Sequence, residues 1–164
     1  MDLAFTGEEK KKKGPTKKWS EGEIEAELKK FDDKLEDDKA NHGEIEQRDT
    51  ILDKAEFLRY EVEDFDAAEK VYREAYAMTG GASKKMEILF ECLLMAFIKE
   101  EVPKIAIDIK TCNKLVEDGA DWDKKNKLKI FEGVYCMMIR DFKKASDLFV
   151  NSIATFTATE VMEF

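Results

Sequence analysis

The stretch of sequence that decides the fold is residues 65–76, which read FDAAEKVYREAY. Its apolar residues recur every three or four positions, the spacing of one face of an α-helix. On that face Ala68, Tyr72 and Ala75 stand at offsets of zero, four and seven. Two helices approach closely where a side chain is small, and a large ring then fills the groove of the next hairpin. We therefore predict that this helix is half of a close-packed helical hairpin.

The same spacing returns 77 residues later, where Ala145, Phe149 and Ser152 stand at the same three offsets. Gly133 lies twelve residues before Ala145, and we expect the two to meet where helices come close. Small and aromatic residues repeated at one spacing are typical of tetratricopeptide-like repeats. The match is degenerate, and the pair around Ala106 fits it poorly. The predicted repeat-packing residues are Ala68, Tyr72, Ala75, Gly133, Ala145 and Phe149.

Each of these two helices follows an Asp-Phe corner, Asp64-Phe65 in the first case and Asp141-Phe142 in the second. An aspartate there can cap the helix by accepting a backbone hydrogen bond. We expect the phenylalanine to staple the corner.

Outward from these segments, apolar stripes of helical period predict about seven helices joined by short turns. We expect them at about residues 20–41, 44–60, 65–78, 83–101, 103–116, 122–139 and 142–156. The fourth is apolar nearly all round, which places it inside the stack. The predicted fold class is all-α, a tetratricopeptide-like α-α superhelix, with one helical-repeat domain over residues 19–164.

The ends of the first helix carry recognisable signals. Ser20 and Glu23 form a capping box, which predicts the start. Gly43 is expected to end the helix in the left-handed conformation. His42 is the only histidine, and we interpret it as a residue at the helix C-terminus.

Residues 1–18 lack apolar periodicity and include four lysines at 10–13. We expect a disordered basic tail, which is native or left from cloning. A nuclear localisation signal is the alternative.

Charge and cysteine content exclude several classes of protein. The net charge is −9, which argues against nucleic-acid binding. Residues 21–49 hold twelve acidic and five basic side chains, so this segment alone contributes −7. The three cysteines lie in apolar helical patterns, as buried free thiols do in a reducing compartment. The longest apolar run, residues 86–98, is too short to cross a bilayer, and no signal peptide opens the chain. We expect a location in the cytoplasm and nucleus.

The sequence contains none of the phosphate-binding, metalloprotease or calcium-loop motifs that indicate catalysis or ligand binding. The Asp-Trp-Asp segment at 121–123 fits either a helix start or a weak metal site. We expect no catalytic residue, metal or cofactor. A peptide-binding tetratricopeptide-type adaptor would line its groove with Lys, Arg and Asn, but Asn113, Lys124 and Asn126 do not recur at the repeat spacing.

Three segments carry a family resemblance: EQRDTILDKAEFLRY at 46–60, GADWDKKNKLKIFEGVYCMMIRDFKKASDLF at 119–149, and SIATFTATE at 152–160. They resemble the subunits of the 26S proteasome lid that belong to the PCI family, over about residues 20–164. The basic N-terminus does not. The resemblance implies a right-handed helical-repeat arm of a non-catalytic scaffold subunit in ubiquitin-dependent degradation. It implies other lid subunits and the ATPase ring as partners. The family's winged-helix module is expected to be absent from this chain. An equivalent scaffold subunit of the COP9 signalosome is the alternative.

Overall fold

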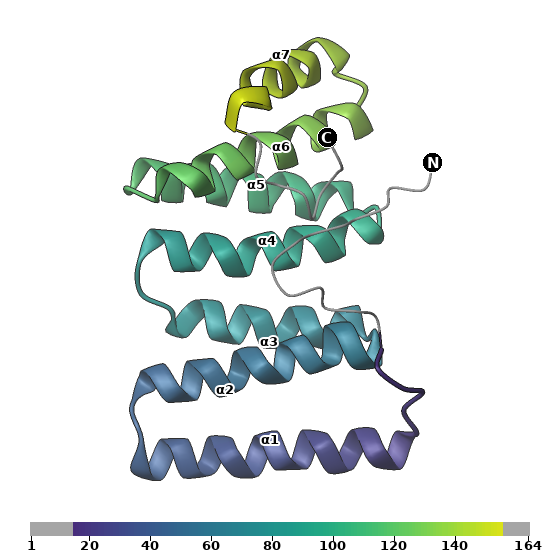
Figure 1. The fold of residues 1–164 in the computed structure, drawn as a ribbon, viewed down its shortest axis with the longest axis vertical. Helices are drawn as coiled ribbons and strands as arrows, with labels where there is room; N and C mark the ends of the chain where they lie inside the picture. Colours follow the sequence, from purple (N-terminus) through teal and green to yellow (C-terminus); the bar gives the residue numbers. More distant parts are fainter. Residues whose placement is uncertain (1–14, 156–164) are drawn as a thin grey trace. The chain divides into compact units, whose positions relative to one another are not determined.

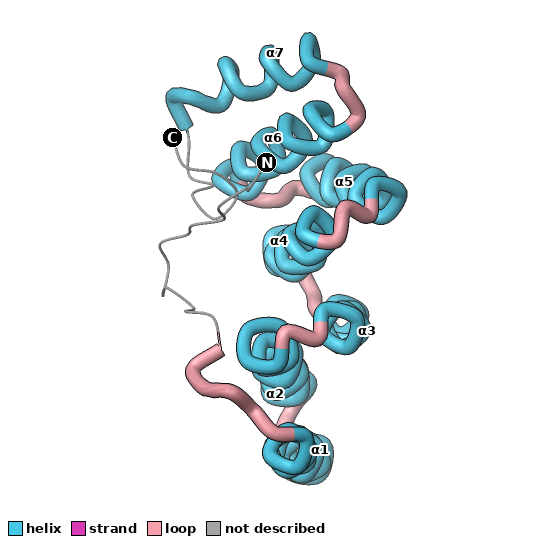
Figure 2. Tube along the Cα trace, turned by 90° about the vertical axis from the view of Figure 1, so that its right-hand side faces the viewer, coloured by secondary structure: helices cyan, strands magenta, loops and turns pink. Residues whose placement is uncertain are grey.

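The structure, a computed structural model, describes residues 15–155 and shows seven α-helices and no strand over that range (Figures 1 and 2). The helices are α1 (Glu21–Asn41), α2 (Glu44–Phe57), α3 (Phe65–Met78), α4 (Ala82–Ile98), α5 (Val102–Glu117), α6 (Trp122–Met138) and α7 (Phe142–Ser152). The predicted all-α class and the seven helices are confirmed. The expected last turn of the seventh helix, at Phe156, lies outside the described residues.

The described residues divide into two compact units, 15–80 with α1 to α3 and 81–155 with α4 to α7. The division lies near Gly80, and the single repeat domain over residues 19–164 stays a prediction. The right-handed superhelix is a property of all the helices together, and it stays a prediction. Of the expected N-terminal tail, residues 15–18 are described, and residues 1–14 lie outside the description.

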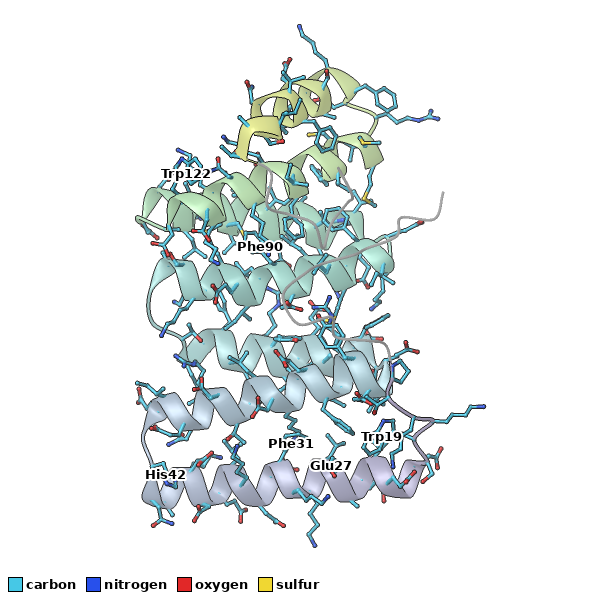
Figure 3. All side chains as sticks on the ribbon, in the orientation of Figure 1. Trp19, Glu27, Phe31, His42, Phe90 and Trp122 are labelled. Carbon is cyan, nitrogen blue, oxygen red and sulfur yellow. The ribbon has the colours of Figure 1, made fainter. Side chains whose placement is uncertain are left out.

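In the first unit α1 packs on α2 and α2 packs on α3, and successive helices run in opposite directions (Figure 1). The capping box at the start of α1 is confirmed. The Ser20 Oγ accepts from the Glu23 backbone N–H at 3.4 Å, and the Ser20 N–H donates to Glu23 Oε2 at 2.9 Å. Trp19 and Phe31 both approach Phe57 of α2 with their rings, at centroid distances of 4.9 and 5.8 Å (Figure 3).

Two predicted helix ends need correction. His42 is the C-cap of α1, as expected, but Gly43 has a φ of −89° and is not left-handed. It serves as the N-cap of α2, because the next helix begins at once and its N–H donates to Glu46 Oε2 at 3.1 Å. At its other end α2 stops at Phe57 and continues as a π-helical turn, Leu58–Val62, which Glu63 terminates with a φ of 61°.

In the second unit α4 packs on α5, α5 on α6 and α6 on α7. Ten residues of α4 are buried, which agrees with its apolar circumference. The Phe90 ring of α4 stacks on Phe131 of α6 with centroids 4.9 Å apart and planes at 2° (Figure 3). Pro103 lies in the first turn of α5, where a missing N–H costs nothing.

Candidate functional site

The predicted repeat-packing residues of the first unit all lie on α3. Ala68 and Ala75 are fully buried, and Tyr72 is 1% exposed. On α2, the helix against which α3 packs, Ala55 is also fully buried. Small residues therefore occur on both helices of this pair, as a close approach requires.

The second unit brings Gly133 of α6 and Phe149 of α7 together. A methyl group added at Gly133 would lie 2.6 Å from Cε1 of Phe149, too close for two carbon atoms. The ring thus covers the glycine, and α6 and α7 approach closely at this point. Ala145, one turn before Phe149, is 2% exposed. Ala145 is therefore buried, and its position near Gly133 stays a prediction.

At both Asp-Phe corners the aspartate caps the helix, as the sequence predicted. Asp64 Oδ1 accepts from the Ala67 N–H at 3.0 Å, and Asp141 Oδ1 accepts from the Lys144 N–H at 3.2 Å. The second phenylalanine does not staple its corner, because Phe142 is 61% exposed. Its ring faces solvent in this part of the chain.

A contact that the sequence did not reveal joins residues 15–19 to the π-helical turn. Glu61 Oε2 accepts three hydrogen bonds, from the Thr16 N–H at 2.9 Å, the Thr16 hydroxyl at 2.7 Å and the Trp19 indole N–H at 2.9 Å. We call this group the N-terminal latch. The Thr16 hydroxyl, the Trp19 indole and the Thr16 backbone, in that order, hold the pKa of Glu61 below its usual range.

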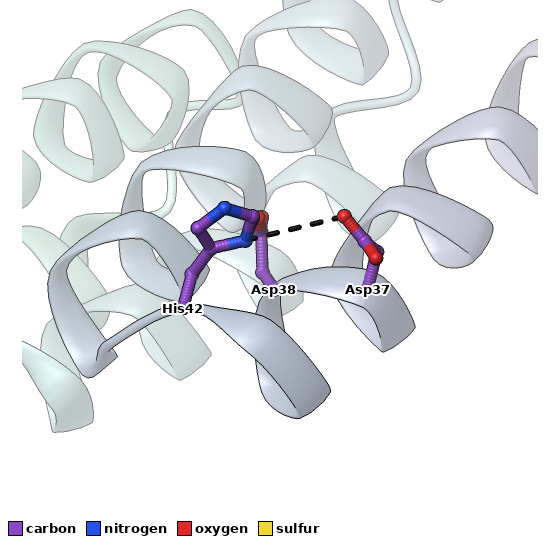
Figure 4. A group of neighbouring side chains, drawn as sticks. All are labelled: Asp37, Asp38 and His42. Carbon is purple, nitrogen blue, oxygen red and sulfur yellow. Dashed lines mark ion pairs between the residues drawn. The ribbon is translucent and has the colours of Figure 1, made fainter.

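Asp37, Asp38 and His42 form the one cluster of potential metal ligands found among residues 15–155, with ligand atoms within 4.8 Å of one another (Figure 4). His42 Nδ1 lies 3.2 Å from Asp38 Oδ1 and 4.0 Å from Asp37 Oδ2. The other oxygen of the buried Asp38, Oδ2, accepts from the Thr50 hydroxyl at 2.6 Å. Both oxygens of Asp38 therefore have partners in the protein, and the cluster ties the end of α1 to α2.

The Asp-Trp-Asp segment is a helix start. Asp121 is the N-cap of α6, although its side chain makes no capping bond, and its N–H donates to the Ser83 Oγ at 2.9 Å. Asp123 pairs with Lys124 at 3.2 Å, and Lys124 also pairs with Glu87 of α4 at 2.7 Å. Trp122 is 67% exposed and projects from the end of its helix (Figure 3). Together these contacts favour the structural interpretation over a metal site.

The comparison with protein families decides the identity of this helical chain. The model of the family described as "26S proteasome subunit RPN7" matches residues 17–164. The chain belongs to the RPN7 family. This match confirms the resemblance that three segments of the sequence had indicated.

Named relatives of the RPN7-family chain are proteasome subunits. The chain is 38% identical over 142 residues to the 26S proteasome non-ATPase regulatory subunit 6 of Dictyostelium discoideum. This alignment covers 87% of the chain and 37% of the relative. The Arabidopsis thaliana homolog is 40% identical over 141 residues, covering 85% and 36%. The RPN7 subunit of Saccharomyces cerevisiae is 29% identical over 131 residues, covering 80% and 30%. The chain thus spans about a third of the length of these relatives.

Within residues 15–155, none of the helices combines the length and the apolar character that a membrane crossing requires.

Proposed function

We propose that this RPN7-family chain is part of a non-catalytic scaffold in the lid of the 26S proteasome regulatory particle. The observation that carries the proposal is the family match over residues 17–164, which extends through both helical units. Its partners would be other lid subunits and the ATPase ring. It would be located in the cytoplasm and nucleus. It would support ubiquitin-dependent degradation through protein contacts alone.

The geometry supports a scaffold. The close contact of Gly133 with Phe149 and the buried alanines of α3 give closely packed hairpins. Two groups of polar side chains near helix ends are engaged within the protein, Asp38 with Thr50 and Asp123 with Lys124. Closely packed helical pairs with charged outer faces present surfaces to partners without chemistry of their own.

Exposed apolar side chains in the second unit are the proposed points of contact. Trp122 is 67% exposed, Phe142 61% and Val150 63%. Phe142 and Val150 lie two turns apart on α7, on the same face of the helix. Tryptophan and phenylalanine on a surface commonly anchor protein interfaces.

An affinity purification tests this function. The 164-residue chain and the full-length Dictyostelium relative are each tagged and expressed in Dictyostelium cells, and co-purifying proteins are identified by mass spectrometry. We expect the relative to bring the regulatory particle with it. We expect the chain to bring a smaller, salt-sensitive amount, because it spans about a third of the relative's length. Neither protein should hydrolyse ubiquitin or peptide substrates above a blank. Retrieval of the particle by the relative and none by the chain, even at low salt, would contradict the proposal.

The alternatives are not favoured. Each relative named above is a proteasome subunit. The side chains that a peptide clamp would need are occupied or buried. Asn113 donates to Glu132 at 2.6 Å, Lys124 pairs with Glu87, and Asn126 is 3% exposed. Titration with acidic C-terminal peptides should therefore show no saturable binding.

A further inference from the structure

The N-terminal latch combines two unusual features at one carboxylate. Glu61 lies within the π-helical turn Leu58–Val62, and a single oxygen of its side chain accepts all three hydrogen bonds of the latch. Short π-helical turns occur frequently at functional sites. The proposed scaffold function makes no use of this arrangement, so the following inference goes beyond it.

The latch depends on Thr16 as a hydrogen-bond donor. Its hydroxyl donates to Glu61 at 2.7 Å, and its side chain is exposed to solvent. A carboxylate only accepts hydrogen bonds, so the contact needs a proton on the Thr16 oxygen. A modification that replaces this proton with negative charge would turn the attraction into repulsion.

Basic residues surround this threonine on both sides. Lysines occupy positions 11–13 before it, and Lys17 and Lys18 follow it directly. In a chain of net charge −9 this concentration of positive charge is local. Charge patterns of this kind select the partner at kinase–substrate contacts, because an acidic substrate groove attracts them.

We propose that Thr16 is a phosphorylation site for a serine/threonine kinase that selects basic residues, and that the phosphate opens the N-terminal latch. In the transfer the Thr16 oxygen attacks the terminal phosphorus of ATP and forms a new O–P bond. The bond to the ADP oxygen breaks, ADP leaves, and the hydroxyl proton passes to the base of the kinase. The product carries about −1.5 to −2 charge at pH 7 beside the Glu61 carboxylate.

Lys17, the lysine next to Thr16, does not take up this charge without losing a contact elsewhere. The Lys17 ammonium lies 2.7 Å from Glu23 Oε1 and 4.2 Å from the centroid of the Trp19 ring. If it turned to the phosphate, it would leave Glu23, whose carboxylate belongs to the capping box of α1. A turn of Lys17 to the phosphate would therefore loosen the start of α1 as the latch opens.

Trp19 reports the state of the latch. Its indole N–H donates to Glu61, and its ring meets Phe57 edge-on at 4.9 Å. When the phosphate repels Glu61, the backbone from Thr16 to Trp19 moves away and the indole enters water. A tryptophan that enters water emits at longer wavelength.

Ser20 is the competing hydroxyl. Lys17 and Lys18 also precede it, but its oxygen accepts from the Glu23 N–H and donates to Glu23 Oε2 at 2.9 Å. A phosphate at Ser20 would sit at the helix N-terminus, which favours negative charge. It would not act on Glu61 directly, so the two sites have different consequences.

The test uses the 164-residue chain with Trp122→Phe, which leaves Trp19 as the single tryptophan. A purified kinase that prefers basic residues on both sides of its target is added with Mg-ATP. Tandem mass spectrometry locates the phosphate, and fluorescence records the Trp19 emission and its quenching by acrylamide. We expect one phosphate on Thr16, emission at longer wavelength, stronger quenching, and a helical circular dichroism minimum that declines only slightly, as the first turn of α1 loosens.

Two variants separate the latch from general effects. Thr16→Ala should take up no phosphate at the latch and should show part of the red shift without kinase. Glu61→Gln keeps the shape of the side chain but removes its charge, so phosphorylation should shift the Trp19 emission much less. Phosphate on Ser20 with none on Thr16, no phosphate on either, or phosphorylated Thr16 with an unchanged emission would each overturn the proposal.

Discussion

At the scale of single residues, the contact between Gly133 and the Phe149 ring defines how α6 meets α7. The spacing of small and aromatic residues could be read from the sequence, and it placed Gly133, Ala145 and Phe149 in one hairpin. The pairing of the glycine with the ring could not be read, because it depends on the rotation of two helices about their axes. Burial of Ala68, Tyr72 and Ala75 followed from helical periodicity alone.

We predict that Gly133→Leu destabilises the chain by about 1–3 kcal/mol, because the new side chain must displace the Phe149 ring. Chemical denaturation followed by circular dichroism measures this loss. The double variant with Phe149→Ala should lose less than the sum of the two single changes, since the smaller residue makes room. Gly22→Ala is the matched control, because nothing lies within 4 Å of its added methyl group. Additive losses in the double variant would show that the contact is not the cause.

Ala145→Leu should cost about 1–3 kcal/mol for the same reason, since this position is 2% exposed. Ala77→Leu on α3 is the same substitution at an exposed position and should leave the melting temperature nearly unchanged. Equal melting temperatures for the two variants would contradict the assignment of Ala145 to the helix contact.

At the scale of elements, most helix starts could be predicted from the sequence, because capping residues are local signals. Ser20 with Glu23, Asp64 and Asp141 all cap the helices that the sequence assigned to them. The π-helical turn was not predicted from the sequence. The N-terminal latch could not be predicted either, since Thr16 and Glu61 are 45 residues apart. The prediction of a left-handed cap at Gly43 was wrong, because the role of this residue depends on how soon the next helix begins.

Acid should loosen the start of α1. The hydrogen bond from Lys17, followed by the backbone and side-chain bonds of Ser20, lowers the pKa of Glu23 from 4.5 to about 2. A depressed carboxyl pKa stabilises the folded state fully above the unfolded value, and this contribution disappears as the pH falls through the folded value. We therefore expect helical circular dichroism to decline between about pH 4.5 and 2. Glu23→Gln should weaken this pH dependence, whereas Glu25→Gln, at an exposed position on the same helix, should not. Equal acid profiles for the two variants would contradict the role of Glu23.

At the scale of the whole molecule, residues 15–155 form two compact helical units, each with its own internal packing. Periodicity reports what each helix buries, but it does not report where contacts along the chain become sparse. Partner contacts are likewise a property of the whole surface, and the resemblance to lid subunits was the only sequence signal for them.

Trp122→Ala should reduce co-purification with the regulatory particle while leaving the melting temperature unchanged, because the side chain is 67% exposed and anchors partners in the proposed function. Quantitative mass spectrometry of the purified complexes measures the first effect, and thermal denaturation measures the second. Lys125→Ala, also exposed in the first turn of α6, is the control. Undiminished co-purification of the tryptophan variant would remove this surface from the proposal.

We propose that this chain is part of a lid scaffold, and a chimera tests that proposal most directly. Residues 17–164 replace the matching region of the Dictyostelium relative, whose alignment with the chain covers 142 residues. The chimera is expressed with an affinity tag in Dictyostelium cells, and its incorporation into regulatory particles is measured by sedimentation and mass spectrometry. We predict incorporation close to that of the tagged parent, because the proposed function gives the exchanged region the same partners in both proteins. A chimera that is folded and abundant but sediments apart from the regulatory particle would contradict the account.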